Sequence, residues 1–252
     1  MRLFAYALLP LLLASPVQAV ELRIISPGIV YNAALSELVD DYNKKSGNTV
    51  LIVRATMDKL INQAKTDTPA ADVVGLPADL MNTLYLDGGI VGATYTPLGR
   101  GELGLAVKKG APKPDISNLA AVKATLRNAK SIASVDPKQG SVGGAVLLAL
   151  DKMGMRKEIE PKIKWMPGGG DVQRSVAAGQ DEIAFGPYLS DMRNPGIDVV
   201  GALPPAAATP VEITGFLSTT VKDRAAAKSL IDYLRSADAA PEWRKAKAFP
   251  VQ

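Results

Sequence analysis

The sequence contains no cysteine and no histidine. Without cysteine it has no disulfide framework, no zinc-thiolate site, no cysteine nucleophile and no lipid-anchored leader. Without histidine, imidazole acid–base catalysis, Ser-His-Asp triads and most transition-metal sites are excluded. Binding chemistry must therefore come from hydroxyls, carboxylates, lysine, arginine and backbone groups, and we expect neither a metal nor a cofactor.

Aromatic residues and excess charge are also scarce. Aromatics make up 5% of the chain, and 29 basic residues stand against 25 acidic ones, for a net charge of +4. So mild an excess, without a run of basic residues, argues against nucleic-acid binding and leaves room for a small anion. The stretch from Gly99 to Gly104 fits the GxGxxG dinucleotide pattern, but it leads into a predicted strand where that motif requires a helix.

One long apolar run begins the chain. Arg2 is followed by apolar residues up to Leu13, and small residues at Val17 and Ala19 precede Val20. This pattern predicts a secretory signal peptide over residues 1–19, too short for a transmembrane helix. We expect the rest to be a soluble, monomeric protein of the bacterial periplasm.

The most informative stretch runs from Ser131 to Met153. Apolar residues 131–135 predict a strand, 136–141 a polar loop, and Val142, Val146 and Leu150 the apolar face of a helix. The first N–H groups of a helix have no intrahelical partner and carry partial positive charge, so this order of elements can bind an anion.

The same unit recurs along the chain, with loops at Ser26, Thr56, Ser141 and Gly170, the last with Asp171 as the predicted helix cap. Strands are predicted at 21–25, 49–54, 71–76, 102–108, 131–135, 162–166, 182–185 and 212–219, and helices at 29–45, 57–65, 78–87, 118–127, 142–153, 172–178, 222–235 and 241–245. Strands that alternate with helices predict an α/β fold with doubly wound parallel sheets.

The length of the chain favours two lobes over one. Passages rich in proline and glycine predict crossings between lobes at 94–101 and 197–205. Lobe I would then comprise 20–99 and 204–252, and lobe II 100–203. Because ligands of open α/β sheets bind at the carboxyl ends of strands, we expect a cleft between two doubly wound lobes, lined by four helix N-termini.

Arginine could supply charge there. Arg54 ends an apolar strand two residues before Thr56, so its side chain lies either at the mouth of the cleft or against a surface acid. Arg100 lies in the first predicted crossing.

The chain resembles type II periplasmic solute-binding proteins, and specifically the molybdate-binding proteins of ABC importers. The resemblance covers nearly all of the mature chain, including PAADVVGLPADLMNTLYLDGGIV at 69–91, DPKQGS at 136–141, SVAAGQDEIAFGPYLSD at 175–191 and AAAKSLIDYLRSADAA at 225–240. It implies ligand contacts from Ser26 with the neighbouring Gly28, Thr56, Gly140 or Ser141, the loop at Gly170 and Asp171, and Tyr188.

PLGRGELGLAVKKGAPKPDIS, at 97–117, resembles a divergent branch of that family to which periplasmic aconitate isomerases are similar. This likeness implies polycarboxylate ligands. Arg54 and Arg100 favour the same chemistry, because a guanidinium fork matches a carboxylate.

We therefore expect a periplasmic component of an ABC importer that captures a small anion, either a molybdate-like oxyanion or a polycarboxylate, and passes it to a membrane permease. The alternative is an isomerase that moves a proton on an unsaturated tricarboxylate, with Tyr188, Asp171, Ser141 or Thr56 as the proton carrier.

Overall fold

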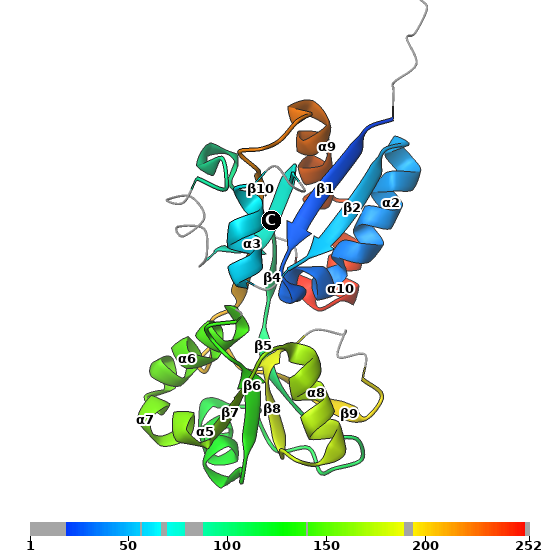
Figure 1. Cartoon of the computed structure of the whole chain (residues 1–252). Coiled ribbons are helices and arrows are strands. Elements are labelled where there is room, and N and C mark those ends of the chain that lie inside the picture. Colours follow the sequence, from blue (N-terminus) through cyan, green and yellow to red (C-terminus); the bar gives the residue numbers. More distant parts are fainter. Residues whose placement is uncertain are drawn as a thin grey trace, which may run out of the picture.

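The computed structural model describes residues 19–55, 57–66, 70–78, 88–139, 141–188 and 194–249. These residues form two sheets with their helices, one above the other and joined by extended segments (Figure 1). Nearly all of the predicted signal peptide and most of the predicted helix at 78–87 lie outside the described residues. Within the described ranges no helix is both long and apolar enough to cross a bilayer.

The first sheet has six strands, and we call it lobe I together with its helices. The strands lie in the order β11 (Ala248–Phe249), β4 (Thr96–Gly101), β10 (Val211–Leu217), β3 (Val73–Pro77), β1 (Glu21–Ser26) and β2 (Thr49–Arg54). Helix α3 (Met57–Ala64) packs on the face that carries Ile25 and Phe216. The opposite face, with Leu22 and Ile213, is covered by α2 (Ser36–Ser46), α9 (Arg224–Leu234) and α10 (Ala240–Lys245).

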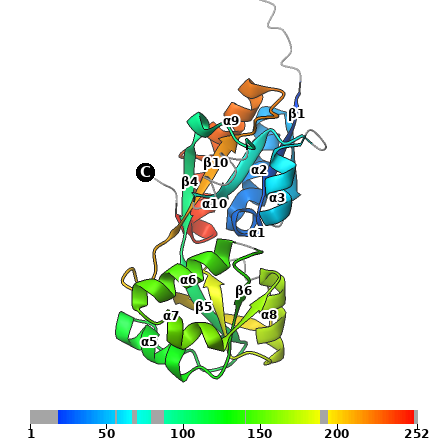
Figure 2. The ribbon, with the colours of Figure 1, turned by 60° about the vertical axis from the view of Figure 1, so that its left-hand side comes forward.

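The second sheet has five strands, and with its helices it forms lobe II. Its order is β7 (Ile163–Met166), β6 (Ile132–Val135), β8 (Ile183–Pro187), β5 (Leu103–Lys108) and β9 (Ile197–Ala202). Phe185 faces α5 (Leu119–Asn128), α6 (Ser141–Met153) and α7 (Arg156–Ile159) in one apolar cluster. Helix α8 (Gly169–Ala178) lies on the other face, as Figure 2 shows.

Both sheets are mixed, so the expectation of purely parallel sheets is corrected. β1 pairs in parallel with β2 and β3, and β6 with β7 and β8. β10 and β5 pair antiparallel with their neighbours on both sides. Each of these two strands enters its lobe from a crossing, so it must run away from the other lobe while its neighbours run toward it.

The segments expected as irregular crossings are largely strands. Thr96–Gly101 is β4 and Ile197–Ala202 is β9, so the chain passes between sheets at Glu102 and again over 203–210. The sequence did not predict a strand around Pro97, because proline is rare inside strands. β4 accommodates it beside a shift in register opposite Ile213 and Thr214.

The single helix predicted at 29–45 is broken. The structure has α1 (Gly28–Val30), a kinked turn at Tyr31–Leu35, and then α2. Ala33 (φ −89°, ψ 39°) and Ala34 (φ 80°, ψ 5°) leave the helical region. No proline or glycine marks this break in the sequence, whereas the predicted end of α2 at Gly47, in the left-handed conformation, is confirmed.

Candidate functional site

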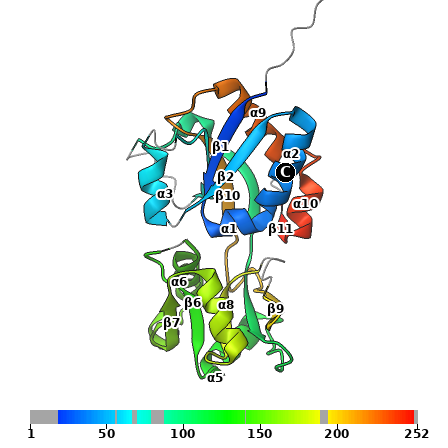
Figure 3. The ribbon, with the colours of Figure 1, turned by 45° about the vertical axis from the view of Figure 1, so that its right-hand side comes forward.

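The carboxyl ends of the parallel strands of both lobes face each other. In lobe I, β1 and β2 end at Ser26 and Arg54, and in lobe II, β6 and β8 end at Val135 and Pro187. β4 ends and β5 begins at the crossing, which sets this orientation. Figure 3 shows α1 at the lower edge of lobe I and α6 at the upper edge of lobe II.

Three predicted residues of lobe I lie together. Ser26 and Arg54 are paired in register at the ends of β1 and β2. The position that a Cβ would take on Gly28 is 4.0 Å from Nη2 of Arg54. The Arg54 guanidinium carbon lies 4.2 Å from the centre of the Tyr31 ring. Arg54 is exposed, and within the described residues it forms no ion pair. The alternative expectation, that Arg54 pairs with a surface acid, therefore finds no such acid among these residues.

Three serine hydroxyls in this region are buried without a partner. Ser26 and Ser134 are 0% exposed and Ser141 is 5% exposed, and within the described chain their Oγ atoms form no hydrogen bond. A buried hydroxyl left unpaired costs about 1 to 3 kcal/mol, so such groups need an explanation. Ser134 was not predicted as a site residue, although a serine inside the apolar strand Ile132–Val135 was the available signal.

The start of α6 is pressed against the end of β6. A Cβ on Gly143 would lie 2.2 Å from the carbonyl oxygen of Val135 and 2.5 Å from the nitrogen of Pro137, whereas Gly144 faces open space. Only glycine allows this approach. It places Ser141, the first residue of α6, with the first N–H groups of that helix beside the strand end.

Helix α8 begins earlier than predicted. Gly168 is its N-cap, so Gly170 and Asp171 lie within the first turn and Asp171 is not the capping residue. The carboxylate of Asp171 accepts a hydrogen bond from Arg174 one turn later. An acid in the first turn is stabilised by the helix dipole, and here it places negative charge at the terminus expected to face the anion.

Tyr188 lies at the crossing between the sheets, and Arg100 lies apart from the Ser26 and Arg54 pair. The backbone N–H of Tyr188 donates to Glu102 at 2.7 Å, which places this half-buried residue at the crossing. Arg100 lies on β4, with β10 and β3 between it and β1, and it stands opposite Glu212. Thr56 and Gly140 lie outside the described residues.

Glu212 also accepts a hydrogen bond from the hydroxyl of Tyr95. That bond is the main reason why the pKa of Tyr95 is raised, and the nearby positive charge of Arg100 opposes the rise. Arg100 therefore already has an acidic neighbour, whereas Arg54 has none among the described residues.

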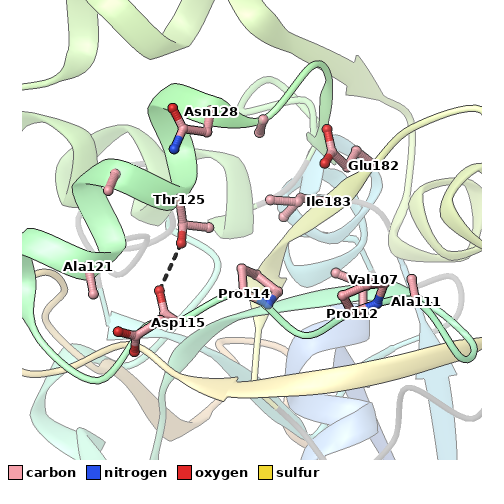
Figure 4. A pocket seen from close by; sticks show the side chains of 12 residues that line it. Val107, Ala111, Pro112, Pro114, Asp115, Ala121, Thr125, Asn128, Glu182 and Ile183 are labelled. Carbon is pink, nitrogen blue, oxygen red and sulfur yellow. Dashed lines mark hydrogen bonds between the residues drawn. The ribbon is translucent and has the colours of Figure 1, made fainter.

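A separate pocket of about 420 Å³ lies in lobe II among α5, the loop after β5 and the start of β8 (Figure 4). Its two carboxylates already accept backbone hydrogen bonds, Asp115 from Ser117 and Glu182 from Lys130. The hydroxyl of Thr125 donates to the carbonyl oxygen of Asp115 at 2.8 Å. An acidic lining does not suit an anion.

The described residues also include no cluster of three or more acidic side chains that could hold a metal ion.

The chain is similar to known proteins over almost its whole length. Residues 23–246 match the family described as bacterial extracellular solute-binding protein. An aconitate isomerase from Pseudomonas sp. is 32% identical over 248 residues, which span 96% of this chain and 92% of that protein. The periplasmic molybdate-binding protein of Azotobacter vinelandii superposes with a TM-score of 0.72 at 15% identity, over 92% of this chain and 100% of that one. The sulfate-binding protein of Mycobacterium tuberculosis gives 0.73 at 16% identity, over 92% and 88% of the two chains.

Proposed function

This chain belongs to the bacterial extracellular solute-binding proteins, and on that premise we propose that it captures a small organic polycarboxylate between its two lobes. The observation that carries the proposal is the set of buried, unpaired hydroxyls of Ser26, Ser134 and Ser141 at the facing strand ends. An anion that accepts hydrogen bonds from them would remove the cost of leaving them unpaired. Donors already fixed in place need little reorganisation on binding.

Arg54 favours a carboxylate over a tetrahedral oxyanion. A tricarboxylate carries up to three negative charges, and a helix N-terminus supplies only about half a positive charge, so a desolvated ligand needs a full positive charge nearby. The guanidinium of Arg54 lies beside Ser26 and is not neutralised by an acid among the described residues. The 32% identical aconitate isomerase, whose name refers to a tricarboxylate, supports the same ligand class.

Capture would require the lobes to close on the ligand. We place the hinges at the two passages between the sheets, Glu102 and 203–210, near the predicted boundaries of lobe I (20–99 and 204–252) and lobe II (100–203). Hinges are typically a few loop residues that absorb a change in backbone angles. Small-angle scattering with saturating trans-aconitate should show a smaller radius of gyration than the ligand-free protein. An unchanged radius at saturation would contradict closure.

Membership of the family supports a wider role. We propose that residues 1–19 direct secretion to the periplasm and that the loaded, monomeric protein hands its ligand to an ABC permease in the inner membrane. A periplasmic molybdate-binding protein and the substrate-binding domain of a putative molybdenum ABC transporter have the same fold and support this role. Uptake of the ligand by cells that lack this chain, measured with labelled trans-aconitate, should fall and should recover when the chain is restored.

The binding test compares ligands on the purified protein. Trans-aconitate and citrate should raise the melting temperature and bind in calorimetry, whereas molybdate, tungstate and sulfate should bind weakly. Arg54→Ala should abolish tricarboxylate binding, and Arg54→Lys should weaken it because the charge remains but the fork is lost. Arg23→Ala is the matched control, since Arg23 lies on the same sheet near the opposite end of β1. Full affinity for molybdate in Arg54→Ala, with no response of the wild type to tricarboxylates, would refute the proposal.

A second candidate function is isomerisation of the bound tricarboxylate, favoured by the aconitate isomerase relative. Such a reaction breaks one C–H bond and forms another across the allylic system, so it needs a proton carrier and no oxidant. Of the predicted carriers, Ser141 has an unpaired hydroxyl and Asp171 is bound to Arg174, while Thr56 lies outside the described residues.

Turnover has a direct assay. Trans-aconitate incubated with the protein in D₂O is followed by proton NMR for appearance of the cis isomer and for deuterium incorporation. A catalyst converts many equivalents, and Ser141→Ala or Tyr188→Phe should slow conversion if that residue carries the proton. If the protein binds trans-aconitate stoichiometrically but does not convert it, the isomerase function is refuted and the binding function stands.

A further inference from the structure

Among the residues that the structure describes, Arg54 contacts an aromatic ring and pairs with no carboxylate. Its guanidinium carbon lies 4.2 Å from the centre of the Tyr31 ring, within the range of a cation–π contact. A guanidinium is planar, and its five N–H donors point outward in its own plane. Stacking on a ring uses the face of the group, whereas an ion pair would occupy those in-plane donors. Tyr31 therefore orients Arg54 and leaves its hydrogen-bonding edge available.

The guanidinium also lies close to the chain that follows β1. The place of a Cβ on Gly28 is 4.0 Å from Nη2 of Arg54, so a larger residue there would crowd the guanidinium. Ser26 is the partner of Arg54 in the parallel register and carries a buried hydroxyl without a partner. The oriented guanidinium thus shares the end of the sheet with an unpaired donor.

A strained turn follows Tyr31. The N–H of Tyr31 donates to the carbonyl of Pro27 at 3.1 Å, and Tyr31 begins the kinked turn that ends at Leu35. Within that turn Ala34 has φ of 80° and is 4% exposed. A residue with a side chain persists in the left-handed region only where its surroundings impose it, and such strained residues cluster at functional sites. The chain changes direction at this turn, between α1, which precedes Tyr31, and α2.

We propose that Tyr31 is a positioning residue, which holds the Arg54 guanidinium flat so that its fork meets a planar carboxylate of the ligand. This inference rests on the proposed capture of a polycarboxylate and explains how the site selects one over a tetrahedral oxyanion. Tyr31 itself acts through Arg54, so the ring and not the phenolic hydroxyl is the part that matters.

The test is a double-mutant cycle in calorimetry with trans-aconitate as the probe. Tyr31→Phe keeps the ring and should change the Kd less than about twofold. Tyr31→Leu should weaken binding about tenfold, which is the size of a strong cation–π contact. In an Arg54→Lys background, which should still bind measurably, Tyr31→Leu should change the Kd less than about twofold, because no planar guanidinium remains for the ring to orient. An equal loss in both backgrounds would overturn the inference.

Proton–nitrogen NMR of the ligand-free protein supplies a readout independent of affinity. The Arg54 Nε–Hε signal, assigned by its disappearance in Arg54→Gln, should be shifted upfield by the ring in the wild type and in Tyr31→Phe, and should lose that shift in Tyr31→Leu. If the shift is lost but trans-aconitate binds with wild-type affinity, the inference fails and the proposed function stands. If the wild type does not bind trans-aconitate, the proposed function fails and the inference fails with it.

Discussion

Replacing a buried serine of the site with alanine should make the ligand-free protein more stable and the complex weaker. Ser26, Ser134 and Ser141 bury hydroxyls that find no partner in the described chain. An unpaired buried polar group costs about 1 to 3 kcal/mol, and alanine removes the group without leaving another unpaired. For a chain of this length, about 1 kcal/mol corresponds to roughly 2 to 4 °C in melting temperature. We expect a rise of that size for each single substitution.

Binding should change in the opposite direction. A hydrogen bond to a charged ligand contributes about 1.5 to 3 kcal/mol, so each alanine should weaken trans-aconitate binding by roughly 10- to 150-fold. Calorimetric melting without ligand and titration with trans-aconitate give both quantities on the same samples. The opposite signs are characteristic of a residue kept for function at the expense of stability.

Ser175→Ala is the matched control. Ser175 is as buried as Ser141, but its hydroxyl donates to Asp181 at 2.6 Å. Removing it leaves a buried carboxylate with one donor fewer, so this variant should melt at a lower temperature with unchanged affinity. If Ser26→Ala also lowers the ligand-free melting temperature, its hydroxyl is satisfied in the free protein, and the reasoning from unpaired serines is refuted.

Two further predictions concern lobe II. Gly143→Ala should destabilise the protein by several kcal/mol and reduce ligand affinity, because its Cβ would lie 2.2 Å from the carbonyl oxygen of Val135. Gly144→Ala is the control, and it should be neutral or stabilise α6 by about 0.5 to 1 kcal/mol. Equal melting temperatures of the two variants would contradict this. Burial pushes the pKa of Asp181 up, but hydrogen bonds from Lys164 and from two serines outweigh it and hold the pKa below the usual value of 3.8. The carboxylate therefore stabilises the fold above about pH 4 and loses this effect as pH falls through the lowered pKa, so the stability lost in Asp181→Asn should be full at pH 7 and shrink near pH 3 in denaturant titrations.

Much of the fold could be predicted from local pattern. Helical periodicity placed α6 after the loop at 136–141, and Gly47 marked the end of α2, since both signals depend only on neighbours in the chain. Repetition of the strand, loop and helix unit predicted two α/β lobes, which the family and its structural relatives confirm. The same pattern drew attention to Ser26 and Ser141, whose hydroxyls the structure finds buried and unpaired.

The sequence by itself determined where helices begin beside strand ends, because capping, glycine and apolar spacing act over a few residues. Tertiary structure decided which of those ends share a surface. Arg54 and Arg100 look alike in sequence, yet sheet order places one beside Ser26 and the other on a strand separated from β1 by two others, opposite Glu212. Tyr31 lies beside Arg54 just before a helix break at Ala33 and Ala34, and no local signal marks either feature. Pairing between distant strands and strain imposed by packing arise only when the whole chain is assembled, so they decided how charge is arranged at the site.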